Sequence, residues 1–296
     1  MRYSIVLSAQ PAQFQVATFK GDLQTNLHRI ASLGYEGVEL AIRDPKQIDY
    51  EALEEQVRSC GLAVPAIGTG QAWGEEGLSF TDPDEAIRQK AIERILSHME
   101  GASRFGAVII IGLIRGIVKP GVAPQQAMSW LVEALRECSR AAEARNLRLV
   151  LEPINRYETS LINTAAEGLE LIEEVGADNF GLLLDTFHMN IEEVDIEASI
   201  RACGKHIFHF HVADSNRWYP GAGHLDFGSI LRTLEGSGYT GWVSGEFLPK
   251  PDAATAAYAG IAHLRTKESV VSEVSEGPEV SEVPEGPKVP KAPNTD

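Results

Sequence analysis

The sequence predicts a single α/β domain built as a (β/α)₈ barrel and followed by a disordered tail. Eight short apolar runs alternate with longer amphipathic stretches, and short apolar runs between helices are typical of buried parallel strands. The chain of 296 residues is long enough for one such domain. A doubly wound open sheet is the alternative, but residues 9–13, which follow the first run, are not the glycine-rich phosphate loop that such sheets usually carry.

The expected elements follow from the two periodicities. Runs with strand character occupy residues 3–8, 37–40, 63–68, 107–111, 148–152, 181–185, 207–211 and 242–246. Helical patterns lie between and after them at residues 22–33, 47–59, 84–105, 124–145, 165–175, 195–202, 228–235 and 253–267. Glycines such as Gly34, Gly61 and Gly106 follow several of these helical patterns, as is typical of helix ends.

The last residues have a different composition. Residues 273–280 are echoed by residues 282–289 in a stretch rich in Glu and Pro that has no aromatic residue. Such a segment cannot bury enough apolar surface to offset the entropy of ordering it. We therefore expect a barrel over residues 1–268 and a disordered, acidic, Pro-rich tail over residues 269–296.

Charge and cysteine content limit the function classes. A net charge of −16 argues against a nucleic-acid or anionic-membrane partner, because such partners require a basic surface. No uncharged apolar stretch has the length of a membrane helix, and the N-terminal residues lack the apolar region of a signal peptide. The three cysteines are scattered, which favours a reducing compartment. We expect a cytoplasmic protein.

Acidic and imidazole side chains stand at the C-terminal ends of the last four apolar runs. These residues are Glu152, Asp185, His211 and Glu246. One carboxylate alone could be a salt-bridge partner, and one His alone is more often a core residue. Because the C-terminal ends of parallel strands meet at one mouth of a barrel, four such residues together indicate one divalent-metal site. The two Glu could also transfer protons.

Three segments then carry a resemblance to a known family. They read LEPINRYET at 151–159, DTFHMNIEE at 185–193 and HVADSNR at 211–217, the last followed by Pro220 and Gly221. Over residues 1–267 the chain resembles the ketose 3-epimerases, that is, the D-tagatose and D-allulose (psicose) 3-epimerases of the xylose-isomerase-like TIM barrels. The resemblance implies an isomerase that inverts carbon 3 of a free ketose such as D-tagatose, D-fructose or D-allulose.

The resemblance also implies roles for individual residues. Glu152, Asp185, His211 and Glu246 match the family's metal ligands, and Glu152 and Glu246 match its proton-transfer pair. Glu158, His188 and Arg217 match contacts to substrate oxygens. We place His188 in a loop beyond its strand. The implied metal is Mn²⁺, with Co²⁺ or Mg²⁺ as substitutes, and the implied assembly is a homodimer or homotetramer. A metal on the ketone oxygen and the neighbouring hydroxyl would stabilise an enediolate while one Glu removes a proton and the other returns one to the opposite face.

Two arginines leave the substrate class open. Arg43 and Arg115 follow the second and fourth strand runs, and each alone could be a surface residue. Together they could bind a substrate carboxylate, because a guanidinium pairs with a carboxylate in a bidentate fork. These segments, with residues 68–72, resemble a subgroup that includes 5-keto-L-gluconate epimerase of inositol breakdown. A keto-sugar acid is therefore an alternative substrate.

Other activities on related barrels fit less well. A hydroxypyruvate isomerase would suit residues 152–155, whereas residues 185–190 and 211–217 favour the epimerases. A xylose-type aldose isomerase needs further carboxylate ligands, which the sequence does not supply. An endonuclease IV-like repair enzyme needs more metal-binding histidines and a DNA-binding face. A non-catalytic sugar-binding protein would not need two opposed Glu at a metal.

Overall fold

Eight parallel strands close into a barrel in the order of the sequence, which confirms the predicted fold class. The computed structural model describes residues 1–11 and 15–275, with side chains up to residue 268. The strands are β1 (Arg2–Ser8), β2 (Gly37–Ala41), β3 (Ala66–Gly68), β4 (Val108–Ile111), β5 (Leu149–Leu151), β6 (Phe180–Asp185), β7 (Ile207–Val212) and β8 (Trp242–Gly245). Strand β8 pairs with β1 and so closes the barrel.

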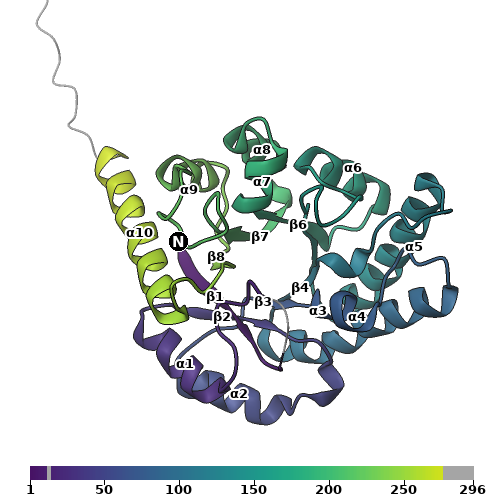
Figure 1. Cartoon of the computed structure of the whole chain (residues 1–296), viewed down its shortest axis with the longest axis horizontal. Helices are drawn as coiled ribbons and strands as arrows, with labels where there is room; N and C mark the ends of the chain where they lie inside the picture. Colours follow the sequence, from purple (N-terminus) through teal and green to yellow (C-terminus); the bar gives the residue numbers. More distant parts are fainter. Residues whose placement is uncertain (12–14, 276–296) are drawn as a thin grey trace, which may run out of the picture.

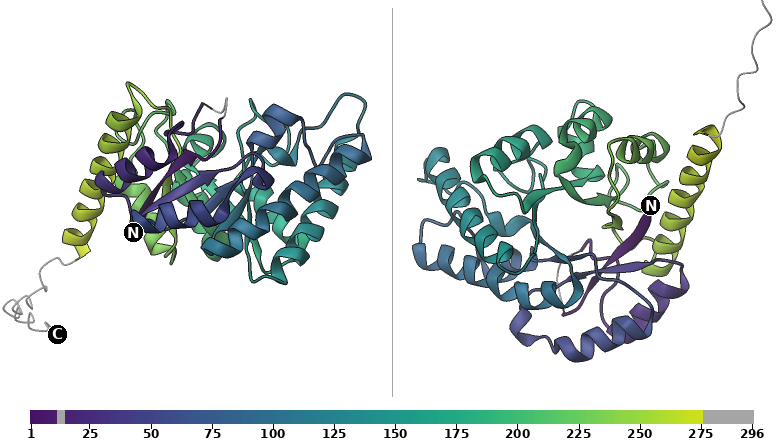
Figure 2. Two further views of the ribbon diagram at one scale, coloured as in Figure 1. Left: turned by 90° about the horizontal axis from the view of Figure 1, so that it is seen from below. Right: turned by 180° about the vertical axis from the view of Figure 1, so that it is seen from behind.

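The helices surround these strands, as Figures 1 and 2 show from opposite sides. They are α1 (Leu23–Ser32), α2 (Tyr50–Ser59), α3 (Gln71–Glu76), α4 (Glu85–Phe105), α5 (Pro124–Glu143), α6 (Ala165–Val175), α7 (Thr186–Glu192), α8 (Ile196–Cys203), α9 (Phe227–Gly236) and α10 (Ala253–Ser275). Three 3₁₀ turns, η1 (Pro45–Gln47), η2 (Leu113–Arg115) and η3 (Gly204–His206), complete the set. Most of the long helices begin at a capping side chain; α6, for example, begins at a capping box formed by Thr164 and Glu167.

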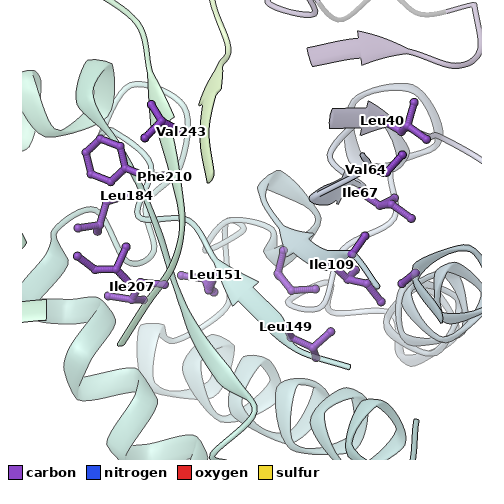
Figure 3. Packing of buried hydrophobic residues seen from close by; sticks show 14 of the residues in the cluster. Leu40, Val64, Ile67, Ile109, Leu149, Leu151, Leu184, Ile207, Phe210 and Val243 are labelled. Atoms are coloured by element: carbon purple, nitrogen blue, oxygen red, sulfur yellow. The ribbon is translucent and has the colours of Figure 1, made fainter. Parts of the chain in front are cut away.

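Alternation along the strands separates an outer core from the barrel interior. The outward side chains pack against the helices, and Figure 3 shows part of this layer, including Leu40, Ile109, Leu151, Leu184 and Phe210. The intervening residues point inward because successive strand residues face opposite sides. Part of the interior is filled by a small apolar cluster of Ala66, Val108, Ile110, Val150 and Leu183. The same alternation places Glu39, His209 and His211 inside the barrel.

The structure differs from the sequence expectation in the start of β3, in two additional short helices and in the length of α10. Strand β3 begins at Ala66 rather than at residue 63, because Pro65 has no N–H to donate to a neighbouring strand. The short helices α3 and α7 were not predicted. Helix α10 continues to Ser275, so the first seven residues of the predicted tail are helical. The rest of that prediction, residues 276–296, lies outside the described residues. Among the helices that are described, none has the length and apolarity to span a bilayer.

Candidate functional site

The four predicted metal ligands lie together at the C-terminal mouth of the barrel. Asp185 is the last residue of β6, and the strand register places it beside His211 of β7. Glu152 and Glu246 each follow their strand by one residue, and their N–H groups donate to the carbonyls of Ile111 and Val212 at 3.3 Å. One donor atom from each of the four side chains lies within 4.8 Å of the other three. All four residues are buried.

The spacing of these donor atoms suits a single cation. The Nδ1 atom of His211 is 3.9 Å from Glu152 Oε1, 3.8 Å from Asp185 Oδ2 and 3.9 Å from Glu246 Oε2. When two atoms each bind one cation at about 2.0–2.6 Å, the separation between the two atoms is similar to the 3.8–3.9 Å found here. Three of the four atoms, Glu152 Oε1, Asp185 Oδ2 and His211 Nδ1, are buried and have no hydrogen-bond partner among the described residues. Buried polar atoms are normally satisfied, so these three fit a site for a divalent cation.

Asp185 is divided between two tasks. Its Oδ1 atom accepts a hydrogen bond from Phe187 N at 2.7 Å and so caps α7, while Oδ2 faces the cluster. Because the cap fixes the carboxylate plane, only one oxygen is presented to the other ligands. The residue therefore suits monodentate ligation.

Burial shifts the pKa values of the three carboxyl groups of the cluster upward. Burial and the neighbouring Glu246 raise the pKa of Glu152 well above its usual range. Burial raises the pKa of Glu246 to about 7, although His211 and Arg217 oppose the shift. Burial also raises the pKa of Asp185. Glu246 can therefore exchange protons near neutral pH, the pKa of Glu152 is shifted in the same direction, and a bound cation would offset the repulsion among the three carboxylates.

A buried carboxylate that the sequence analysis did not single out lies behind the cluster. Glu39 Oε2 is 2.8 Å from His209 Nε2 and 2.9 Å from His211 Nε2. Burial would raise the pKa of Glu39, but the two imidazoles outweigh burial and lower its pKa well below the usual range. An ionised Glu39 accepts from Nε2–H of His211, which leaves Nδ1 of that ring for the cluster. His209 is the second donor to Glu39.

The imidazole of His188 is held in one tautomer. Its Nδ1 atom accepts hydrogen bonds from the side-chain amide Nδ2 of Asn155 at 2.8 Å and from the backbone N–H of Asn155 at 3.4 Å. Because a backbone N–H can only donate, Nδ1 is an acceptor and the ring proton is on Nε2, 3.6 Å from Glu152 Oε1. Burial and Arg217 lower the pKa of His188 well below its usual range, so the ring is neutral. His188 lies in α7 and not in the predicted loop.

Arg217 and Glu158 form part of the rim of the site. Arg217 Nη1 donates to Glu158 Oε1 at 2.8 Å, and its Nη2 lies 3.8 Å from Glu246 Oε2. The guanidinium also stacks over Phe187, 4.7 Å from the ring centre. The backbone of Arg217 has a φ of 61°, a left-handed conformation that is uncommon outside glycine and is found at functional sites. The nearby Asp214 accepts the backbone N–H groups of Ser215, Gly221 and Leu225 and so fixes the loop that carries Arg217.

The two arginines for which a role in binding a substrate carboxylate was left open have partners within the protein. Arg115 is fully buried, and its guanidinium donates to the carbonyls of Gly112, Ile162 and Glu152. It links η2 to the backbone of the β5 end instead of facing the mouth. Arg43 forms ion pairs with Glu75 at 2.7 Å and Glu76 at 3.6 Å, both on α3.

A partly enclosed cavity opens above the cluster. One side carries three of the proposed ligands, Glu152, His211 and Glu246, and the rim residues His188, Glu158 and Arg217. Neither Arg43 nor Arg115 is among the described residues that line the cavity. The other side is formed by the ends of β1 to β4, with Val6, Ala41, Ile110, Leu113 and residues 68–71.

Comparison with known proteins agrees with this geometry. Residues 27–267 match the family described as the xylose isomerase-like TIM barrel. The chain is 34% identical to the L-ribulose 3-epimerase of Mesorhizobium japonicum, covering 80% of this chain and 77% of that protein. It is 40% identical to the D-psicose 3-epimerase of Agrobacterium fabrum, covering 73% and 76%. A solved L-ribulose 3-epimerase structure superposes with a TM-score of 0.79 at 27% identity, covering 93% of this chain and 98% of that one.

These matches extend over the whole barrel and include the strand ends that carry the cluster. The family match covers all but the first strand. Relatives above 30% identity over more than two thirds of the chain act on ketoses, as their names state. The chain therefore belongs to the ketose 3-epimerases of the xylose isomerase-like TIM barrel family, and it is an enzyme of the isomerase class.

Proposed function

We propose that the protein is a metal-dependent epimerase that inverts carbon 3 of a free ketose. The observation that carries the proposal is the pair of buried glutamates, Glu152 and Glu246, on strands three apart in the barrel, with His211 Nδ1 3.9 Å from an oxygen of each. Inversion of a carbon next to a ketone requires one group that removes a proton from one face and a second that returns a proton to the other. Two carboxyl groups on opposite sides of a cation site meet that requirement.

The proposed ligands are Glu152, Asp185, His211 and Glu246, and the proposed metal is Mn²⁺, with Co²⁺ or Mg²⁺ as substitutes. Three carboxylates and one imidazole are ligands that suit such cations. When bound, a divalent cation would stabilise the negative charge that develops on the substrate oxygens. Glu39 would orient His211 toward the cation through the hydrogen bond to Nε2.

The chain's other residues would orient the sugar and move its protons. Glu152 and Glu246 alternate as acid and base, and the raised pKa of each carboxyl brings it closer to neutral pH. His188 presents its Nε2–H to a substrate oxygen, because Asn155 holds the proton on that nitrogen. Glu158 and Arg217, fixed against each other, bind further substrate oxygens from the rim.

The proposed substrates are neutral ketoses such as D-tagatose, D-fructose and D-allulose (D-psicose). The names of the relatives support D-psicose and add L-ribulose. The alternatives are a keto-sugar acid, as for 5-keto-L-gluconate epimerase, and hydroxypyruvate for an isomerase. A homodimer or homotetramer is the proposed assembly, as the family resemblance implies. The cytoplasm is the proposed compartment, supported by three cysteines that are all unpaired thiols.

A product screen with solvent exchange tests the proposal. Purified protein with added Mn²⁺ is incubated with ketohexoses, ketopentoses, keto-hexonates and hydroxypyruvate in ²H₂O, and products are separated by chromatography. We expect the 3-epimer of at least one ketose to form and to carry one deuterium at carbon 3. After the metal has been removed with a chelator, we expect no epimer and no deuterium incorporation. Failure to form an epimer or to incorporate deuterium with any ketose would exclude the proposed function.

A further inference from the structure

Within the described part of the chain, Gln71 carries an unpaired polar atom on the side of the cavity that faces away from the cluster of proposed metal ligands. The walls there are apolar, formed by Val6, Ala41, Ile110 and Leu113. Thr69 also lines this side, but its hydroxyl is used, because it donates to the carbonyl of Ile110 at 2.6 Å. Gln71, the first residue of α3, is only 4% exposed, and its Oε1 atom has no hydrogen-bond donor among the described residues.

The neighbours of Gln71 fix the orientation of its amide. Nε2 of Gln71 donates to the hydroxyl of Ser8 at 3.1 Å. That hydroxyl gives its only proton to the carbonyl of Gln10 at 2.7 Å, so it can only accept from Gln71. A flipped amide would place Oε1 against an oxygen whose proton is already committed. The nitrogen is therefore held against Ser8, and the oxygen is the free end.

The position of Gln10 is itself secured at the end of the neighbouring strand. Gln10 Oε1 accepts the backbone N–H groups of Arg43 and Asp44, each at 2.9 Å, and Gln10 Nε2 donates to the carbonyl of Asp44 at 2.9 Å. The amide of Gln71 is therefore the last member of a chain of hydrogen bonds that joins the ends of β1, β2 and β3. An acceptor held this firmly is preorganised to bind a donor.

A buried carbonyl oxygen with no donor is unfavourable, and the cavity is where a donor can arrive. A sugar hydroxyl can donate to it. A carboxylate can only accept, so it would meet the oxygen with like partial charges. We propose that Gln71 Oε1 accepts a hydrogen bond from the terminal hydroxyl of the substrate, at the position that a carboxylate occupies in a keto-sugar acid, and thereby selects a neutral ketose over the acid.

The proposal rests on the function proposed above and chooses between its two substrate classes. The partners of Arg43 and Arg115 point to the same choice. The guanidinium groups that would have recognised an acid are paired with Glu75 and Glu76 or with backbone carbonyls. Gln71 adds an acceptor oxygen that would repel the carboxylate of a keto-sugar acid.

The test compares the Gln71→Met variant with the wild type on a matched set of substrates. Methionine keeps the length of the side chain and removes the acceptor. The set contains the best neutral ketose, its analogues that lack the hydroxyl at carbon 4, 5 or 6, and the matching keto-hexonate. Thr69→Val is the control, since it changes the same wall without removing the free acceptor. Thermal melting of both variants checks that they fold.

We expect wild-type kcat/KM to fall by about 10- to 100-fold on the deoxy analogue that lacks the terminal hydroxyl, as for the loss of a buried hydrogen bond. For Gln71→Met, kcat/KM on the parent ketose should fall by a similar factor, and kcat/KM on that analogue should not fall further. The ratio of kcat/KM for the neutral ketose to kcat/KM for the keto-hexonate should become smaller. Thr69→Val should change all substrates by one common factor.

Two results would overturn the proposal for Gln71 while leaving the epimerase intact. One is an equal loss by Gln71→Met on the parent and on every deoxy analogue. The other is a wild type that prefers the keto-hexonate to the neutral ketose. A wild type that epimerises no ketose and exchanges no proton would instead refute the proposed function, and with it the role of Gln71.

Discussion

Replacing Glu39 with Gln is expected to weaken metal binding without unfolding the barrel. The side chain keeps its shape, so its amide can still bridge His209 and His211, which lie 2.8 and 2.9 Å from the carboxylate. The negative charge is lost, and with it the charge-assisted character of both hydrogen bonds. The ring of His211 then becomes a poorer donor of electron density through Nδ1 and is less firmly oriented.

The magnitude follows from the contact to His211. A hydrogen bond to a charged group contributes about 1.5–3 kcal/mol, which corresponds to about 10- to 160-fold in a dissociation constant. Replacing such an outer partner of a metal-binding His typically lowers affinity by about 10- to 100-fold. Since Glu39 and His211 are fully buried, solvent does not screen the interaction. We therefore expect the Kd for Mn²⁺ to rise by about one to two orders of magnitude.

The assay is calorimetric titration of Mn²⁺ into protein stripped with a chelator, with the stoichiometry determined in the same experiment. Glu51→Gln is the matched control, because it removes the same charge from an exposed position in the first turn of α2. An unchanged Kd for Glu39→Gln would refute the reasoning. So would two cations per wild-type chain, because Glu39, His209 and His211 also bring ligand atoms within 4.8 Å of one another and could form a second site.

Three further predictions concern the glutamate pair, the effect of pH and Arg115. Glu152→Gln and Glu246→Gln should each slow epimerisation by about 10²- to 10⁴-fold when enough Mn²⁺ is added to load the variant, with bound metal measured, and each should still exchange the carbon-3 proton of only one epimer in ²H₂O; substantial turnover by either metal-loaded variant would contradict the two-base mechanism. Burial raises the pKa of Glu246 to about 7, and Glu39 and the cluster carboxylates overcome burial and raise the pKa of His211 to about 10. Because both pKa values are higher in the folded protein than in the unfolded one, the stability that protonation of these groups provides is lost as the pH rises. The Tm of metal-free protein should therefore fall from pH 6.5 to 8.5, added Mn²⁺ should restore it, and Glu246→Gln should reduce the slope; a flat profile would argue against the crowding of charges. Arg115→Ala should destabilise the fold by about 3 kcal/mol or more in urea unfolding, because it leaves buried carbonyls unpaired. Its activity should fall equally on neutral and acidic sugars, whereas a loss confined to keto-hexonates would restore the carboxylate-binding role.

The barrel and the cluster could be predicted because both depend on local patterns. Each strand is a short apolar run, and each proposed ligand is the polar residue at the C-terminal end of such a run. Glu152 and Asp185 follow the inward-facing apolar residues Val150 and Leu183. The period of two that packs Leu151 and Leu184 outward also points these polar residues inward. Position along the chain was therefore sufficient to place them at one mouth.

The residues that were missed or misjudged depend on contacts between distant segments. Glu39 lies in the middle of an apolar run, and only the closed barrel brings it to His209 and His211, which follow it by about 170 positions. Arg115 follows a strand just as a ligand would, but residues 161–162 from the next βα unit provide the carbonyls that bind it. A sequence pattern cannot distinguish an arginine that faces the mouth from one that is used to hold the backbone.

Asp185 shows why the short helix α7 also escaped prediction. Its carboxylate has one oxygen on Phe187 N and the other in the cluster, so the residue ends β6 and begins α7 with no loop between them. A sequence reader who assigns Asp185 to the metal expects a loop to follow, and one who assigns it to a helix cap expects no ligand. The side chain satisfies both demands because a carboxylate has two oxygens. Helix α7 in turn carries His188 to the position where Asn155 can fix its tautomer, so the cap on Phe187 positions a residue of the active site as well as a strand end.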